Sequence, residues 1–182
     1  MVHLKNSGYV PTDATTLLAK ADQLTSGMDV IVRDMRVSTK YLEFDVSVKK
    51  EELEEVVKKF QSIGSLNNAR HVVEEKIEKE EALKRAKQYF NDEKYWECHE
   101  VLEGVWKKTH EGEKDLVQGI ILIAAALVHY QKNENDICLS IMRRAMEKLS
   151  SSSGVYHDID MDKFRKITEN MISSGKIGPF MI

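Results

Sequence analysis

The spacing of the apolar residues changes near residue 75, and this change limits the folds open to the chain. Before it, segments 29–37 and 41–48 alternate apolar and polar residues on either side of a short Ser-Thr-Lys turn. This alternation predicts the two strands of a hairpin. After residue 75, the segments repeat their apolar residues at the spacing of an α-helix. We therefore expect a part that contains a sheet, followed by a purely helical part.

The first part fits the order strand, helix, strand, strand, helix, strand. Strands are expected within 2–10, 29–37, 41–48 and 65–73, and helices over 14–24 and 51–63. This order is that of a split βαβ unit, also called a ferredoxin-like unit. We predict an α+β ferredoxin-like domain over residues 1–75.

The second part, residues 76–182, is predicted to be an all-α bundle, so that the protein is predominantly α. Its helices are expected over 76–91, 93–109, 114–132, 137–149 and 160–172. Short turns between them favour antiparallel neighbours. The longest apolar run, 116–130, is too short to span a membrane and contains Gln118 and His129. This run predicts the central buried helix.

Composition narrows the class of protein. The chain has 182 residues, 42% of them hydrophobic, and a net charge of -3, which is typical of a soluble globular protein. This charge gives no general attraction to nucleic acid or to an anionic membrane. Cys98 and Cys138 lie in helical patterns and are expected to be buried thiols, as in a reducing compartment. The N-terminus has no apolar signal core. We predict a cytoplasmic protein.

The segment 95–106, Tyr-Trp-Glu-Cys-His-Glu-Val-Leu-Glu-Gly-Val-Trp, is the strongest candidate for a functional site. Read as a helix, it places His99 and Glu103 on one side, one turn apart. The same side carries Tyr95 and Trp106, with Trp96 at its edge. We expect the His–Glu pair inside the apolar stripe, where ionisable groups are costly unless they have partners.

Three readings of this pair stay open: a structural pair that fixes helix docking, a metal site, and an acid–base or ligand-binding site. A His and a Glu one turn apart can hold one metal ion, but two ligands do not complete a site. Gln118 and His129 share a face of the next helix, roughly 16 Å apart along it, so only one is expected to meet the pair. The pattern is not the zincin His-Glu-x-x-His.

Other features are weaker. His3, His71 and His157 have no partners at ligand spacing. The apolar tail 177–182 is expected to dock on its own bundle rather than on a second subunit. Aromatic residues on a ferredoxin-like sheet can stack on RNA bases, but Tyr41 and Phe44 are expected on opposite faces and lack the RNA-recognition signature.

The segment 90–106 resembles the signature of domain-of-unknown-function family 309, His-x-x-x-Glu-x-x-Trp, with His99, Glu103 and Trp106 in its three places. Segments 117–120, Val-Gln-Gly-Ile, and 124–129, Ala-Ala-Ala-Leu-Val-His, are similar to the family's next helix. Cys98 stands where a small residue such as alanine is usual. The resemblance covers about residues 86–149. It implies an all-α fold there and a site at the motif, and it supplies no established activity.

Our leading hypothesis is a helical pocket that binds a small ligand or a protein partner, and it leaves open whether the protein is an enzyme or an oligomer. Its expected residues are His99, Glu103, Trp106, Tyr95, Trp96, Gln118 and His129. The first alternative is a metal-dependent hydrolase with His99 and Glu103 as ligands of a divalent ion, joined by His129 or Glu100. The second is RNA binding through the N-terminal sheet, which the charge and the missing signature do not favour.

Overall fold

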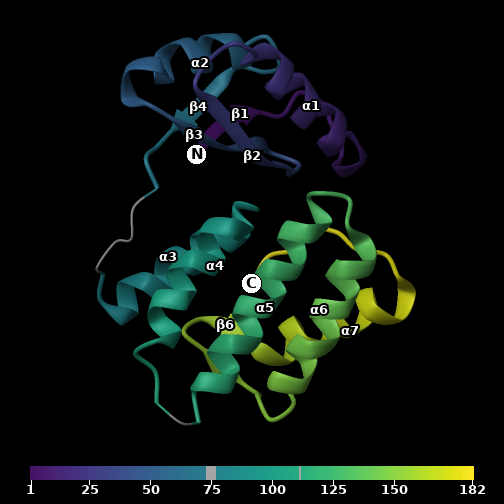
Figure 1. The fold of residues 1–182 in the computed structure, drawn as a ribbon. Coiled ribbons are helices and arrows are strands. Elements are labelled where there is room, and N and C mark those ends of the chain that lie inside the picture. Colours follow the sequence, from purple (N-terminus) through teal and green to yellow (C-terminus); the bar gives the residue numbers. More distant parts are fainter. Residues whose placement is uncertain (73–76, 111) are drawn as a thin grey trace. The chain divides into compact units, whose positions relative to one another are not determined.

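The computed structural model describes residues 1–72, 77–110 and 112–182. The chain forms two compact units (Figure 1). The N-terminal unit comprises Met1–Glu75 with Gln131–Asn133, and the C-terminal unit comprises Lys76–Tyr130 with Glu134–Ile182. The expected boundary between residues 75 and 76 itself lies outside the described residues.

The N-terminal unit is the expected ferredoxin-like α+β fold. Its elements are β1 (Val2–Lys5), a 3-10 turn (Pro11–Asp13), α1 (Ala14–Leu24), β2 (Val30–Val37), β3 (Tyr41–Val48), a second 3-10 turn (Lys50–Glu52), α2 (Leu53–Phe60) and β4 (Leu66–Ala69). The four strands form one sheet in the order β2-β3-β1-β4, and every neighbouring pair is antiparallel. This is the strand order that a split βαβ unit produces.

Side chains alternate across this sheet as the sequence pattern requires. Val2 pairs with Phe44 in the register of β1 and β3, and both lie in the core with residues of α1 and α2. The ring of Phe44 lies 4.8 Å from that of Phe60, centroid to centroid. Because strand residues alternate between faces, the next pair in register, His3 and Glu43, lies on the opposite face.

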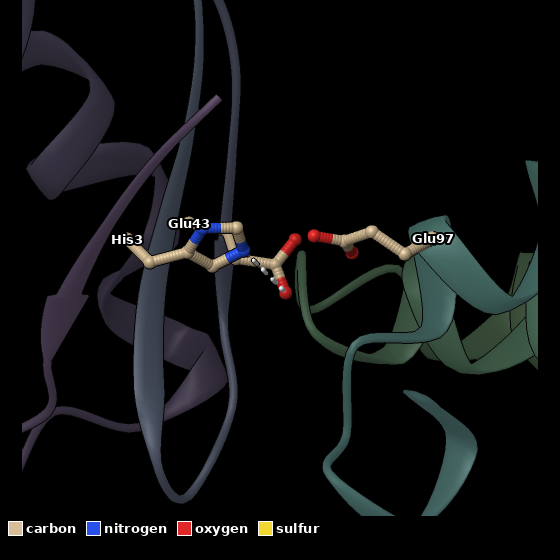
Figure 2. A group of neighbouring side chains, drawn as sticks. All are labelled: His3, Glu43 and Glu97. Carbon is tan, nitrogen blue, oxygen red and sulfur yellow. Dashed lines mark ion pairs between the residues drawn. The ribbon is translucent and has the colours of Figure 1, made fainter. Parts of the chain in front are cut away.

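The opposite face of the sheet carries a row of charged groups. Figure 2 shows the imidazole of His3 and the carboxylate of Glu43 on their neighbouring strands, with 3.9 Å between His3 Nε2 and Glu43 Oε2. Arg36 of β2 is also in register with Glu43, and its Nε lies 3.2 Å from Glu43 Oε1. His3 therefore has a carboxylate partner, although none stands near it in the sequence. Phe44 lies in the core, which leaves Tyr41 as the aromatic residue of β3 on this face.

The C-terminal unit is helical, as predicted. It contains α3 (Lys79–Asn91), α4 (Tyr95–Trp106), α5 (Lys114–Tyr130), α6 (Asn135–Lys148), β5 (Val155–Tyr156), β6 (Ile159–Asp160) and α7 (Met161–Ser174). The apolar run expected to be central forms α5, which contributes eight buried residues: Val117, Gly119, Ile120, Ile121, Ile123, Ala124, Ala126 and Leu127. Cys98 and Cys138 are buried and free, as expected.

The short hairpin β5–β6 was not expected from the sequence. Its turn residues His157 and Asp158 have φ angles of 43° and 63°, in the left-handed region. Two-residue strands are too short to show a periodic pattern, which explains why the sequence does not reveal them.

The apolar tail docks on its own bundle, as expected. The ring of Phe180 lies 5.1 Å from that of Phe90 and 5.7 Å from that of Phe164. The Ile182 backbone donates a hydrogen bond to Asn91 Oδ1 at 2.8 Å and accepts one from Asn91 Nδ2 at 3.2 Å. In the described part of the chain, no helix has the length and apolar character needed to cross a membrane.

Candidate functional site

Helix α4 carries the motif and is held by one apolar side. Its buried apolar residues are Tyr95, Cys98, Leu102 and Val105, which belong to one core with residues of α3 and α5. Their spacing of three and four residues is that of a helix with one buried face. Glu97, which Figure 2 also labels, is a buried charged residue of the same helix.

The His–Glu pair lies at the margin of this buried face. The side chain of His99 is 29% exposed and that of Glu103 is 38% exposed. Our expectation that the pair lies inside the apolar stripe is therefore wrong. The buried face is centred on the smaller residues Cys98, Leu102 and Val105, so it is rotated away from the aromatic side of the helix.

The imidazole of His99 lies between two carboxylates. Its Nδ1 atom is 3.3 Å from Glu100 Oε1, and its Nε2 atom is 3.9 Å from Glu103 Oε1. A carboxylate only accepts hydrogen bonds, so Nδ1 carries the proton in the bond to Glu100. A neutral imidazole then keeps its lone pair on Nε2 and directs it toward another acceptor. The 3.9 Å separation is too long for a direct hydrogen bond.

Trp106 stands at the end of the same helix. Its indole Nε1 is shielded from solvent and has no hydrogen-bond partner among the described residues. The ammonium of Lys114, in the first turn of α5, lies 4.4 Å from the ring centroid, which is a cation–π contact. Gln118 follows Lys114 by one turn on the same side of α5. Gln118 is partly buried.

The other predicted residues are Tyr95 and Trp96 of α4 and His129 of α5. Tyr95 is buried, and its ring packs edge-on against Phe90 at 5.1 Å. Burial, with Glu93 as a secondary cause, raises the pKa of Tyr95 well above its ordinary value. Trp96 is partly exposed. His129 lies near the other end of α5 and forms a short hydrogen bond with Glu134, so its imidazole already has a carboxylate partner within the same unit.

The comparison with protein families concerns this part of the chain. Residues 83–141 match the DUF309 family, a domain of unknown function. The matched segment includes all of α4 and α5 and parts of α3 and α6. The resemblance expected from the motif is confirmed for this segment. No curated protein matches the chain.

Within the DUF309 segment, sequence reasoning missed Lys114. Lys114 opens a helix whose first turn is charged, so its sequence position suggests a solvated residue. Its contact with Trp106 depends on how α4 and α5 pack, which spacing along one helix does not reveal.

Proposed function

We propose that His99, Glu103 and Trp106, here called the α4 strip, bind a small ligand or a protein partner through a group that is cationic or donates hydrogen bonds. The observation that carries this proposal is the 3.9 Å separation of His99 Nε2 and Glu103 Oε1 on a partly exposed surface. Both atoms are acceptors when the imidazole is neutral with its proton on Nδ1. An ammonium or a metal ion placed beside this pair could contact both atoms.

The partial exposure of the strip supports binding over a purely structural role. At 29% and 38% exposure, the two side chains keep contact with water, so a ligand can reach them. Ion pairs at this level of exposure contribute only about 0–1 kcal/mol to stability. The ammonium of Lys114 already lies over the indole of Trp106, so the ligand group is expected at His99 and Glu103.

A second candidate is a metal-dependent hydrolase, and one observation favours it. The Nδ1 atom of His99 is held by Glu100, which resembles the carboxylate–histidine arrangement behind many metal ligands. Catalytic zinc sites, however, use three protein ligands. Among residues 1–72, 77–110 and 112–182, the geometry places no third ligand atom with His99 and Glu103. We therefore rank metal-dependent hydrolysis second.

Ligand-observed NMR with matched sets of small amines and small carboxylic acids tests the proposal. We expect amines to bind the wild-type protein and to lose binding in Glu103→Gln and His99→Ala. Glu147→Gln, an exposed position on α6, is the matched control and should bind as the wild type does. Equal binding of amines to the wild type and to Glu103→Gln would refute the proposal.

Metal analysis of untagged protein, purified without chelators, separates the two candidates. Near-stoichiometric zinc, iron or manganese that disappears in His99→Ala would favour the hydrolase. Urea unfolding of His99→Ala separates binding from architecture. We expect the free energy of unfolding to change by less than about 1 kcal/mol, because the His99 side chain is partly hydrated. A loss of several kcal/mol with no metal in either protein would instead make the pair architectural.

A further inference from the structure

A cavity of about 240 Å³ lies in the C-terminal unit, away from the α4 strip. Its lining comes from α3, the β5–β6 hairpin, α7 and the tail, through Lys87, Asp158, Asp160, Lys163, Phe164, Met181 and Ile182. Pockets for drug-sized ligands usually measure about 300–1,000 Å³. This cavity therefore suits a smaller molecule.

Several of the lining groups are held in place by their neighbours. Lys87 Nζ donates a hydrogen bond to the carbonyl oxygen of Asp158 at 2.5 Å. Asp160 Oδ1 accepts a hydrogen bond from the backbone N–H of Lys163 at 2.9 Å and so caps α7. Phe164 is only 1% exposed and forms a fixed apolar wall. The cavity thus presents an ammonium and a carboxylate that hydrogen bonds already hold in place.

We infer that this cavity binds a small zwitterion with an apolar side chain, of the class of a free aliphatic amino acid. Lys87 and Lys163 supply two positive charges for a ligand carboxylate, and Asp158 and Asp160 supply two negative charges for a ligand ammonium. The two lysines would attract a simple anion, but the two aspartates would repel it. The aspartates would attract a simple cation, but the lysines would repel it. A zwitterion satisfies both pairs at once.

The apolar part of the lining selects the ligand's side chain. Phe164, Met181 and Ile182 form an apolar side, so an aliphatic chain placed there loses contact with water. Met181 is 68% exposed without a ligand and would gain most from such a contact. The tail thus completes the site, and its docking through Phe180 and Asn91 holds the apolar wall in place.

Titration of the full chain with L-leucine, followed by ¹H–¹⁵N NMR, tests the inference. We expect shifts at the backbone amides of the lining residues. Lys87→Met and Asp160→Asn should each weaken leucine binding by on the order of tenfold, because each removes a charged partner. Asparagine still caps α7, so Asp160→Asn should remain folded. Lys166→Met, an exposed position on α7 outside the lining, is the control and should bind as the wild type does.

Two further probes test the ligand class. 4-Methylpentanoate keeps the carboxylate and the whole carbon chain of leucine but lacks the ammonium group. Isoamylamine keeps the ammonium group and the aliphatic chain but lacks the carboxylate. We expect both to bind more weakly than leucine by on the order of tenfold. Absence of leucine-dependent shifts at the lining residues would overturn the inference. So would equal affinity for leucine and 4-methylpentanoate, or unchanged leucine binding in folded Lys87→Met and Asp160→Asn.

Discussion

Replacing Gly119 with alanine should destabilise the C-terminal unit, although alanine is the better helix former. Gly119 lies within α5, and a Cβ atom there would stand 2.4 Å from Leu149 Cγ and 2.5 Å from Leu149 Cδ2. Non-bonded carbons prefer about 3.5–4.0 Å, so the overlap is roughly 1 Å. Leu149 is fully buried at the end of α6, and its branching carbon cannot move aside as a flexible chain end could.

The size of the effect follows from two opposing terms. Glycine to alanine inside a helix gains about 1 kcal/mol. An extra methyl group in a packed core costs typically about 1–3 kcal/mol. Because the clash involves two atoms of a fully buried residue, we take the upper part of that range. The expected net loss for Gly119→Ala is about 1–2 kcal/mol, or roughly 2–8 °C in Tm.

Gly104→Ala is the matched control, because the same change occurs there without the clash. Gly104 lies within α4, and a Cβ atom would meet nothing within 4 Å. We therefore expect a gain of up to about 1 kcal/mol. Urea unfolding followed by tryptophan fluorescence reports on the right unit, because both tryptophans belong to α4. If both variants raise the urea midpoint equally, the packing of α5 against Leu149 is not as described.

Three further perturbations test the C-terminal unit. Burial raises the pKa of Cys138 from 9.0 to about 12, so the unfolded thiol ionises first and stability should fall as pH rises through this range; a flat urea midpoint there would contradict this. Burial alone would raise the pKa of Glu113, but hydrogen bonds from Lys79 and Tyr156 lower it below 4.5. The ionised Glu113 should therefore stabilise the fold above pH 4.5, and this stabilisation should be lost as the pH falls below 4.5. In Glu113→Gln, the free energy of unfolding should depend less on pH in this acid range. Phe180→Ala should speed amide hydrogen exchange in residues 177–182, because the ring no longer packs on two buried phenylalanines; unchanged exchange would show that the tail is held otherwise.

Elements with a long, regular pattern were predictable from the sequence. The hairpin of β2 and β3, the amphipathic α2 and the apolar α5 all lie where the spacing of apolar residues places them, within a few residues at each end. The strand order followed from the element order, because a split βαβ unit has few arrangements. The resemblance to the DUF309 family could also be detected from the sequence. His99, Glu103 and Trp106 have the spacing of the family's motif, and the segments similar to its next helix follow them in the same order.

Contacts that join distant parts of the chain were not predictable. His3 has no carboxylate near it in the sequence, and it faces Glu43 only because the register of β1 and β3 brings them together. His157 likewise lies 3.2 Å from Glu80, through its Nδ1 and the carboxylate Oε2, although their sequence spacing suggests nothing. Such pairs depend on strand register and helix packing, which a single sequence does not specify by spacing.

The position of His99 and Glu103 relative to the buried face of α4 bears directly on their function. Laid out at about 100° per residue, the buried apolar residues of α4 centre about 80° from His99 and about 120° from Glu103. The sequence pattern predicts the pair inside the apolar stripe, but the core contains Tyr95, Cys98, Leu102 and Val105 and leaves the pair outside. A His–Glu pair in the core would need its partner for stability. At the margin of the buried face, the His99–Glu103 pair remains partly hydrated and contributes little to the free energy of folding. We therefore expect its role to be in binding.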